Sequence, residues 1–192
     1  VEPVTDGIQE ITAGGIRTED GREREVDTII FGTGFAATQF LTPMRVTGRD
    51  GRDLHEDWAR GAAAYLGMAV SGYPNFHVLY GPNTNLGSGS IIYMLECQQR
   101  YIVSLLQAQD EQGWSTAEVT PQAERAWIDE MRERSAGTTF EGGCQSWYVT
   151  ADGVNTNNWT GTMREYRMRT ATPDLAAYRF ETGADKPKRR AA

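Results

Sequence analysis

The sequence predicts a mixed α/β fold, or α+β if the 192 residues are considered alone. The expected parts are a β-hairpin or meander, short buried strands, two main helices and a long C-terminal loop. Three observations predict this fold. Strand-like segments surround glycine turns near the N-terminus, short apolar runs end in glycine-rich loops, and two later segments repeat apolar residues at helical spacing. Hydrophobic residues make up 39% and charged residues 23%, which is typical of a chain that folds.

Residues 7–31 are expected to form antiparallel strands. Three isoleucines fall around a Gly14-Gly15 turn, and Asp20-Gly21 is a strong signal for a hairpin turn. The apolar run Ile29–Phe31 is typical of a strand that is buried on both faces. A second short buried strand is expected at Val78–Tyr80, after an irregular stretch that contains many glycines and prolines.

Two helices are expected, and the longer one follows a glycine-rich loop. Ser90 is a suitable N-cap for it, and Gly113 marks its end. Its apolar residues form one stripe: Ile91, Met94, Leu95, Tyr101, Ile102, Leu105 and Leu106. The second helix begins at Thr120-Pro121 and ends near Gly137. Residues 138–162 are rich in Gly, Thr and Asn and are expected to form a long loop of the kind that often carries function.

Charge and residue content exclude several classes of protein. Acidic residues outnumber basic ones by 26 to 19, and the net charge of −7 argues against a nucleic-acid partner. We recognise no membrane helix and no signal peptide. The two cysteines and two histidines lack metal-ligand spacing, so we expect no metal site and a cytoplasmic location. Because the chain does not begin with Met, we expect it to be a piece of a longer protein.

The first candidate site is Gly32–Ala37, which matches the dinucleotide-binding pattern G-x-G-x-x-A. That pattern requires a helix that opens at the second glycine, and Thr42-Pro43 would interrupt such a helix. We therefore reject this interpretation. The two glycines still allow a ligand or another segment to approach the backbone closely, and a plain tight turn is the alternative.

The second candidate site is the loop Gly81–Ser90 with the helix that follows it. A helix N-terminus carries about half a positive charge and unpaired amides, and glycines let a ligand approach these amides. The loop has no lysine, so it is not a Walker-type phosphate loop. Asn83, Thr84 and Asn85 suit a polar heterocycle better than a triphosphate. An ordinary capped helix behind a surface loop is the alternative.

Several sequence blocks, in order, resemble flavin-containing and Baeyer–Villiger monooxygenases, in particular the hydroxyacetophenone monooxygenase branch. Asp27–Phe35 is similar to their D-x-x-x-x-A-T-G-[FY] signature, with Gly32 where the family usually has Ala. The resemblance covers roughly residues 5–180. Its other blocks are Tyr65-Leu66-Gly67, Gly72–Phe76, Gly81–Thr84, Gly89–Met94, Glu96, Gln98, Arg100-Tyr101-Ile102, Ser146-Trp147-Tyr148, Ala151-Asp152-Gly153, Asn157-Asn158-Trp159 and Gly161.

This resemblance implies the C-terminal part of a class B flavoprotein monooxygenase with two dinucleotide-binding domains. In such enzymes NADPH reduces FAD, and a flavin C4a-peroxide formed with O2 inserts oxygen next to a ketone or aldehyde carbonyl. Residues 1–35 would be strands that return from the NADPH domain to the FAD domain, and residues 36–113 the C-terminal part of the FAD domain. Residues 114–180 would form a C-terminal helix and mobile-loop region, and residues 181–192 a disordered tail.

The resemblance also implies contacts with the cofactors. Thr33, Gly34 and Phe35 would lie at the return crossing between the two domains. The helix after Ser90 would direct its positive end at the pyrimidine edge of the flavin. Trp147 matches a loop tryptophan that contacts NADP in relatives. The flavin loop would comprise Gly81, Pro82, Asn83, Thr84, Asn85 and Leu86.

Much of the family pattern is absent from the sequence, including both G-x-G-x-x-G motifs and the block with the peroxide-stabilising arginine. We therefore expect no catalytic residue in this chain, no turnover by the chain alone, and little retention of FAD or NADPH. Strands without their usual partners would favour self-association. Two alternatives stay open: a flavin monooxygenase that oxidises nitrogen or sulfur, and a non-catalytic subunit that completes a flavin site on another chain.

Overall fold

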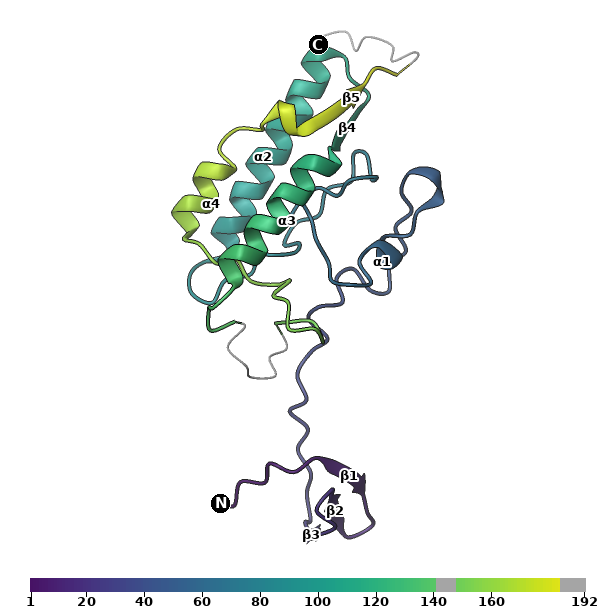
Figure 1. The fold of residues 1–192 in the computed structure, drawn as a ribbon, viewed down its shortest axis with the longest axis vertical. Coiled ribbons are helices and arrows are strands. Elements are labelled where there is room, and N and C mark those ends of the chain that lie inside the picture. Colours follow the sequence, from purple (N-terminus) through teal and green to yellow (C-terminus); the bar gives the residue numbers. More distant parts are fainter. Residues whose placement is uncertain (141–147, 184–192) are drawn as a thin grey trace. The chain divides into compact units, whose positions relative to one another are not determined.

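The computed structural model describes residues 1–140 and 148–183 of the chain (Figure 1). The chain divides into two compact units, Val1–Phe35 and Ala36–Ala192, and each is described by itself. The expected tail at residues 181–192 falls mostly on residues 184–192, which lie outside the described residues.

Unit 1 is a three-stranded antiparallel sheet in the order β1-β2-β3. The strands are β1 (Ile8–Ile11), β2 (Gly15–Thr18) and β3 (Glu23–Glu25). In the turn between β2 and β3, the amide of Gly21 donates to the carbonyl of Thr18 at 2.9 Å, and Gly21 has φ +80°. This left-handed conformation favours glycine, so the Asp20-Gly21 signal correctly predicted the hairpin.

The prediction of a buried strand at Ile29–Phe31 is wrong for this structure. The segment forms no strand, Ile30 is 90% exposed, and Phe31 is also exposed. The sheet of unit 1 ends with β3 at Glu25, and none of the described residues pairs with the run that follows. A strand that is apolar on both faces is stable only between neighbouring strands in a sheet whose two faces are covered. The described residues of unit 1 provide neither.

Unit 2 has α2 (Ile91–Gln112) and α3 (Pro121–Ser135) as its main helices, as the sequence predicted. Ser90 and Thr120 are their N-caps, and Gly113 ends α2 in the left-handed conformation. The sequence interpretation missed α4 (Met163–Arg169) and the antiparallel pair β4 (Thr116–Val119) and β5 (Tyr178–Glu181). Shorter elements are η1 (Arg49–Gly51), α1 (Leu54–Asp57) and η2 (Leu175–Ala177).

The prediction of a buried strand at Val78–Tyr80 is also wrong. None of these three residues forms a strand or a bridge in the described part of the chain, and the neighbouring His77 forms an isolated bridge with Ala69. Val78 is buried, but Leu79 and Tyr80 are exposed. The amide of Tyr80 donates to a glutamine side chain of α2 instead of to a strand.

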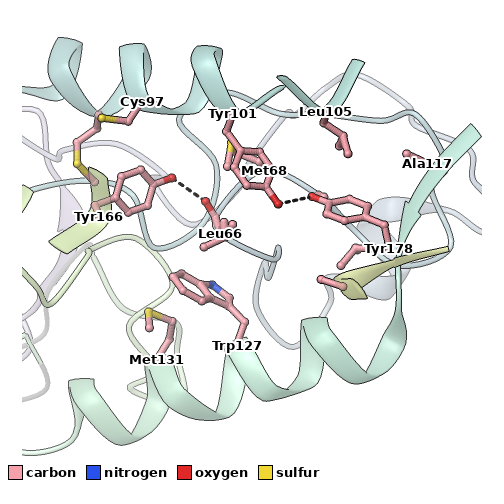
Figure 2. Packing of buried hydrophobic residues seen from close by; sticks show 14 of the residues in the cluster. Leu66, Met68, Cys97, Tyr101, Leu105, Ala117, Trp127, Met131, Tyr166 and Tyr178 are labelled. Carbon is pink, nitrogen blue, oxygen red and sulfur yellow. Dashed lines mark hydrogen bonds between the residues drawn. The ribbon is translucent and has the colours of Figure 1, made fainter. Parts of the chain in front are cut away.

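The main core of unit 2 lies between α2, α3, α4 and the β4–β5 pair (Figure 2). Tyr101 of α2 donates through its hydroxyl to the hydroxyl of Tyr178 in β5 at 3.2 Å. The buried face of α2 is more polar than predicted, while Leu106 of the predicted stripe is exposed. The residues on that buried face are Met94, Cys97, Gln98, Tyr101, Leu105 and Gln109.

Candidate functional site

The loop Gly81–Ser90 joins the core of unit 2 to the N-terminus of α2. Gly81–Thr84 are buried, Asn85 and Leu86 are half-buried, and Gly87–Ser90 are exposed. The loop therefore has a base that lies inside the protein and an outer part that a ligand can reach. Within the base, Asn83 adopts the left-handed conformation with φ +57°, which Asn tolerates better than most residues.

The base of the loop lies directly on the backbone of Gly67. A Cβ atom at Gly67 would collide with the side chain of Thr84, and one at Gly81 would collide with the carbonyl of Gly67. The hydroxyl of Thr84 donates to the carbonyl of Gly81 at 2.7 Å, which closes the turn. Glycine is therefore needed at both positions for the two segments to approach this closely.

The segment Asn155–Trp159 runs alongside the loop, and the sequence interpretation did not foresee this pairing. The amides of Asn83 and Asn85 donate to the carbonyls of Thr156 and Asn157 at 2.8 and 2.9 Å. The amide of Trp159 returns a hydrogen bond to the carbonyl of Asn85 at 2.7 Å. The asparagine cluster at residues 155–158 was the available signal, since Asn side chains hydrogen-bond the backbone of nearby residues and favour turns.

Asn155 shapes this segment. Its Oδ1 accepts hydrogen bonds from the amides of Asn157 and Asn158 at 3.2 and 2.8 Å, and its Nδ2 donates to the carbonyl of Asn158 at 3.0 Å. Its own carbonyl accepts from Nδ2 of Asn83 at 2.9 Å. The buried side chain of Asn155 thus holds the turn that supports the loop.

The polar side chains of the loop are used within the protein. Asn83 donates to Asn155, and Nδ2 of Asn85 donates to Oδ1 of Asn158 at 2.7 Å. The hydroxyl of Tyr80 donates to Oδ1 of Asn85, also at 2.7 Å. These side chains therefore position the loop, and the groups that remain for a ligand are mainly backbone amides of its exposed part.

The N-terminus of α2 is positive and is not neutralised by its own side chains. Ser90 caps the helix by accepting a hydrogen bond from the amide of Tyr93 at 3.3 Å, and no acidic residue lies in the first turn. The amides of Ile91 and Ile92 have no acceptor within the helix because they belong to its first turn. A negative or electron-rich group beside Gly87–Ser90 would be stabilised there.

A buried relay of hydrogen bonds fixes the start of the loop. Oε1 of Gln98 accepts from the amide of Tyr80 at 2.9 Å, and Nε2 of Gln98 donates to the hydroxyl of Tyr166 at 2.9 Å. That hydroxyl donates to the carbonyl of Leu66 at 2.7 Å (Figure 2). Burial raises the pKa of Tyr166, so the phenol stays protonated and keeps its role as donor.

Trp159 connects the supporting segment to α3 and α4. Its ring stacks on that of Trp127 with centroids 5.9 Å apart, and the guanidinium of Arg134 lies 5.0 Å from the Trp159 ring. Arg134 pairs with Glu165 of α4 at 2.6 Å. The loop is thus supported by a chain of contacts that reaches the main helices.

The other predicted site residues fall in two further segments of the chain. Thr33, Gly34 and Phe35 lie in an exposed, irregular stretch of unit 1, where Gly34 has φ +77°. Trp147 lies outside the described residues.

Among the helices of the described residues, none combines the length and the apolar content that a bilayer crossing requires.

No family model matches the chain, but curated relatives do. A Baeyer–Villiger monooxygenase from Streptomyces coelicolor is 42% identical over 93% of this chain and 35% of its own length. An FAD-binding monooxygenase from Aspergillus niger is 44% identical over 83% of this chain and 27% of its own length. A phenazine N-monooxygenase from Lysobacter antibioticus is 34% identical over 69% of this chain and 24% of its own length. The chain thus spans about a third of the length of such relatives.

Solved structures agree with these relatives. A steroid monooxygenase bound to NADP matches 93% of this chain with a TM-score of 0.73 and 29% identity. A closed cyclohexanone monooxygenase matches 93% of this chain with a TM-score of 0.76 and 28% identity. In both cases the match covers 34% of the solved chain and falls in its C-terminal part.

Proposed function

The chain is a homologue of the C-terminal third of Baeyer–Villiger monooxygenases, and we propose that it forms the corresponding part of an FAD- and NADPH-dependent enzyme. The whole enzyme would insert one oxygen atom of O2 next to the carbonyl of a ketone or aldehyde. Identities of 42% and 44% to a Baeyer–Villiger and an FAD-binding monooxygenase support this proposal.

The observation that carries the proposal is the exposed loop Gly87–Ser90 at the positive end of α2. FAD, when bound, would supply the redox and oxygen chemistry. The amides of Ile91 and Ile92 would face the pyrimidine edge of the ring and stabilise the negative charge that it carries when reduced. The buried contacts beneath the loop would keep these amides in place before the cofactor arrives.

A buried donor beside the loop also fits a ring with carbonyl acceptors. Asn158 is 1% exposed, and its Nδ2 has no hydrogen-bond partner among the described residues. Its Oδ1 is bound to Asn85, so the unpaired group lies next to the loop. A buried donor without a partner is costly, and an acceptor supplied by a bound group would remove that cost.

The remaining cofactor contacts are part of the same proposal. We assign Thr33, Gly34 and Phe35 to the crossing between the two dinucleotide domains, and Trp147 to a contact with NADP. This assignment depends on the motif blocks that surround these residues in the sequence.

The described residues could contact the pyrimidine edge of the flavin ring, but they offer no site for the pyrophosphate of FAD. The loop carries no lysine, and the sequence lacks a G-x-G-x-x-G turn that opens a helix for the pyrophosphate. We therefore propose that the chain alone turns over no substrate and holds FAD weakly or not at all. Titration of the purified chain with FAD, followed by flavin fluorescence, checks this. A stoichiometric yellow complex would contradict it.

The whole enzyme provides the test of the reaction. A protein that contains these 192 residues and the remaining two thirds of a relative should bind FAD and consume NADPH and O2 with a ketone. The expected product is the ester, identified by mass spectrometry. A flavin-loaded enzyme that oxidises NADPH but forms no ester from any ketone or aldehyde would contradict the proposal.

Oxidation at nitrogen or sulfur is the second candidate function, and the 34% identity to a phenazine N-monooxygenase favours it. Product analysis with a ketone, a thioether and an aromatic N-heterocycle in parallel separates the two reactions. A third candidate is a separately encoded subunit that completes a flavin site on another chain. The mass of the native gene product distinguishes this candidate from a longer enzyme, because a separate subunit would have the mass of this chain.

We further propose that the isolated chain self-associates, which light scattering would detect. We also propose a cytoplasmic location.

A further inference from the structure

Gln98 links the two ends of the loop Gly81–Ser90. The residue before the loop is Tyr80, whose amide donates to Oε1 of Gln98 at 2.9 Å. The loop ends where α2 begins, at Ile91, and Gln98 lies about two turns further along the same helix. Gln98 therefore connects the entry of the loop to the helix that forms its exit.

The hydrogen bonds of this side chain have one possible direction. The amide of Tyr80 can only donate, so the group of Gln98 that faces it is the carbonyl oxygen. Nε2 then donates to the hydroxyl of Tyr166 at 2.9 Å, and this hydroxyl donates to the carbonyl of Leu66 at 2.7 Å (Figure 2). Because a carbonyl can only accept, the backbone at both ends fixes the orientation of the glutamine and of the phenol.

Both backbone ends of this relay are in a conformation that side chains disfavour. Leu66 has φ +53° and Tyr80 has φ +57°, in the left-handed region. A residue with a Cβ atom keeps this conformation only where the surrounding contacts enforce it. Gln98 and Tyr166 are both 0% exposed, so water cannot replace the hydrogen bonds that they make.

The two strained residues stand next to the closest contact at the base of the loop. Leu66 precedes Gly67, and Tyr80 precedes Gly81; a Cβ atom at Gly81 would collide with the carbonyl of Gly67. The relay therefore holds two backbone segments together at the point where they touch. Strained backbone that buried contacts enforce is common at functional sites, where it places groups before a ligand arrives.

We propose that Gln98 is a positioning residue of the candidate flavin site. By closing the loop, it holds the exposed part Gly87–Ser90 beside the N-terminus of α2 before a cofactor binds. Because Gln98 is buried, it acts on the site through the loop. The part of this inference that concerns flavin rests on the proposed function, whereas the closure of the loop does not.

Hydrogen exchange of the loop amides in the complete 192-residue chain tests the closure. Gln98→Leu should raise the exchange rate of the amides of Gly81–Ser90 on the order of tenfold, because local opening no longer breaks a buried hydrogen bond. Gln109→Leu is the matched control. Gln109 is a second buried glutamine of α2, about three turns further on, and it donates to Asn75. This control should leave the exchange of the loop unchanged.

Gln98→Glu separates the hydrogen bonds from the packing of the side chain. A neutral carboxylic acid can accept from the amide of Tyr80 and donate to Tyr166, as the glutamine does, whereas a carboxylate cannot donate. Burial raises the pKa of a carboxyl group. The variant should therefore match the wild type at pH 5 and show faster loop exchange than the wild type at pH 8. Burial also raises the pKa of Tyr166 and of the adjacent Cys97, so both keep their protons over this range.

The flavin part needs a protein that joins these 192 residues to the part of the Streptomyces coelicolor relative outside the match. In this protein Gln98→Leu should raise the dissociation constant of FAD on the order of tenfold, because the loop is no longer positioned before binding. The reduction potential of the flavin should become more negative, because displaced amides stabilise the reduced ring less. Gln109→Leu should change neither quantity.

Each outcome decides one part of the proposal. Wild-type loop exchange in Gln98→Leu, or equal acceleration in Gln98→Leu and Gln109→Leu, overturns the closure of the loop. Absence of recovery at pH 5 in Gln98→Glu overturns the assigned hydrogen bonds. Faster loop exchange with unchanged FAD affinity and potential overturns the positioning role. If the joined wild-type protein binds no FAD, the proposed function and the flavin role both fail, and the exchange experiment still decides the closure.

Discussion

Asn155 is the residue on which the support of the candidate flavin loop depends most directly. Its side chain makes three hydrogen bonds within the turn, and its carbonyl holds Asn83. The sequence predicts that Asn83, Thr84 and Asn85 suit a polar heterocycle, and this assignment stays a prediction. The sequence does not reveal that the side chains of Asn83 and Asn85 also hydrogen-bond within the protein, because their partners lie some 70 residues away, as in the contact of Asn83 with Asn155.

Replacement of Asn155 tests this role. Asn155→Ala removes three hydrogen bonds from a buried turn, and the free energy of unfolding should fall by about 2–3 kcal/mol. Urea unfolding followed by tryptophan fluorescence measures this. Asn157→Ala is the matched control, because the Asn157 side chain makes one long hydrogen bond of 3.4 Å to the carbonyl of Tyr148. A similar loss in both variants would contradict the role of Asn155.

Glu124 makes the stability of unit 2 depend on pH. Burial raises its pKa to about 7, although its carboxylate accepts a hydrogen bond from the amide of Ser71 at 3.1 Å. The folded state therefore binds this proton more tightly than the unfolded state does. The stabilisation is fully present below the ordinary glutamate pKa of 4.5 and is lost as pH rises toward about 7. Glu124→Gln should match the wild type at pH 4.5 and exceed it at pH 8 by about 1–2 kcal/mol.

Glu118 is the control, because its pKa is shifted in the direction opposite to that of Glu124. Burial favours its neutral form, but hydrogen bonds from Arg49 and Arg179 outweigh burial and lower its pKa. Its contribution to stability is thus present above the ordinary glutamate pKa and is lost as pH falls through the lowered value. Glu118→Gln should destabilise the protein at pH 7 by about 2–4 kcal/mol, since two arginines lose a partner. Thermal melts at several pH values compare both variants, and parallel curves would contradict the assignment.

At the scale of elements, the two long helices and the hairpin at Asp20-Gly21 were predictable, whereas α4 and the β4–β5 pair were not. Helix ends are determined by nearby residues, such as Ser90 and Thr120 at the N-caps of α2 and α3. Strands depend on partners that are distant in sequence. Thr116 of β4 pairs with Glu181 of β5, which lies 65 residues further along the chain. Ile29–Phe31 has the pattern but lacks a partner among the described residues.

Gly113 provides a test at this scale. It ends α2 with φ +70°, and a Cβ atom there would meet no other atom within 4 Å. Gly113→Ala should therefore cost about 1 kcal/mol purely from the left-handed backbone. Gly113→Asn should cost less, because Asn tolerates this conformation better. Differential scanning calorimetry of the wild type and both variants measures their relative stabilities. Equal stability of Gly113→Ala and the wild type would contradict the prediction.

At the scale of the whole molecule, the order of the motif blocks predicted more than any single block. Gly32–Ala37 alone matches a dinucleotide pattern, and the loop Gly81–Ser90 alone fits an ordinary capped helix. Together with Gly72–Phe76 and the later blocks they predicted the family that the relatives share. The support of the loop by Asn155–Trp159 was not predictable in this way, because it arises from tertiary packing.

The division into two units leads to a prediction about the origin of stability. Both hydrophobic clusters lie in unit 2: one is centred on Tyr101 and Tyr166, the other on Leu54 and Trp58. Unit 1 is a small sheet whose β1 is exposed at every position, and a sheet of this size adds little burial. Removal of residues 1–35 should therefore leave the melting temperature of unit 2 unchanged within about 2 °C, which corresponds to about 0.5 kcal/mol for a domain of this size. Circular dichroism at 222 nm during heating measures this. A fall of more than about 5 °C would contradict this prediction and would mean that unit 1 contributes to the stability of unit 2.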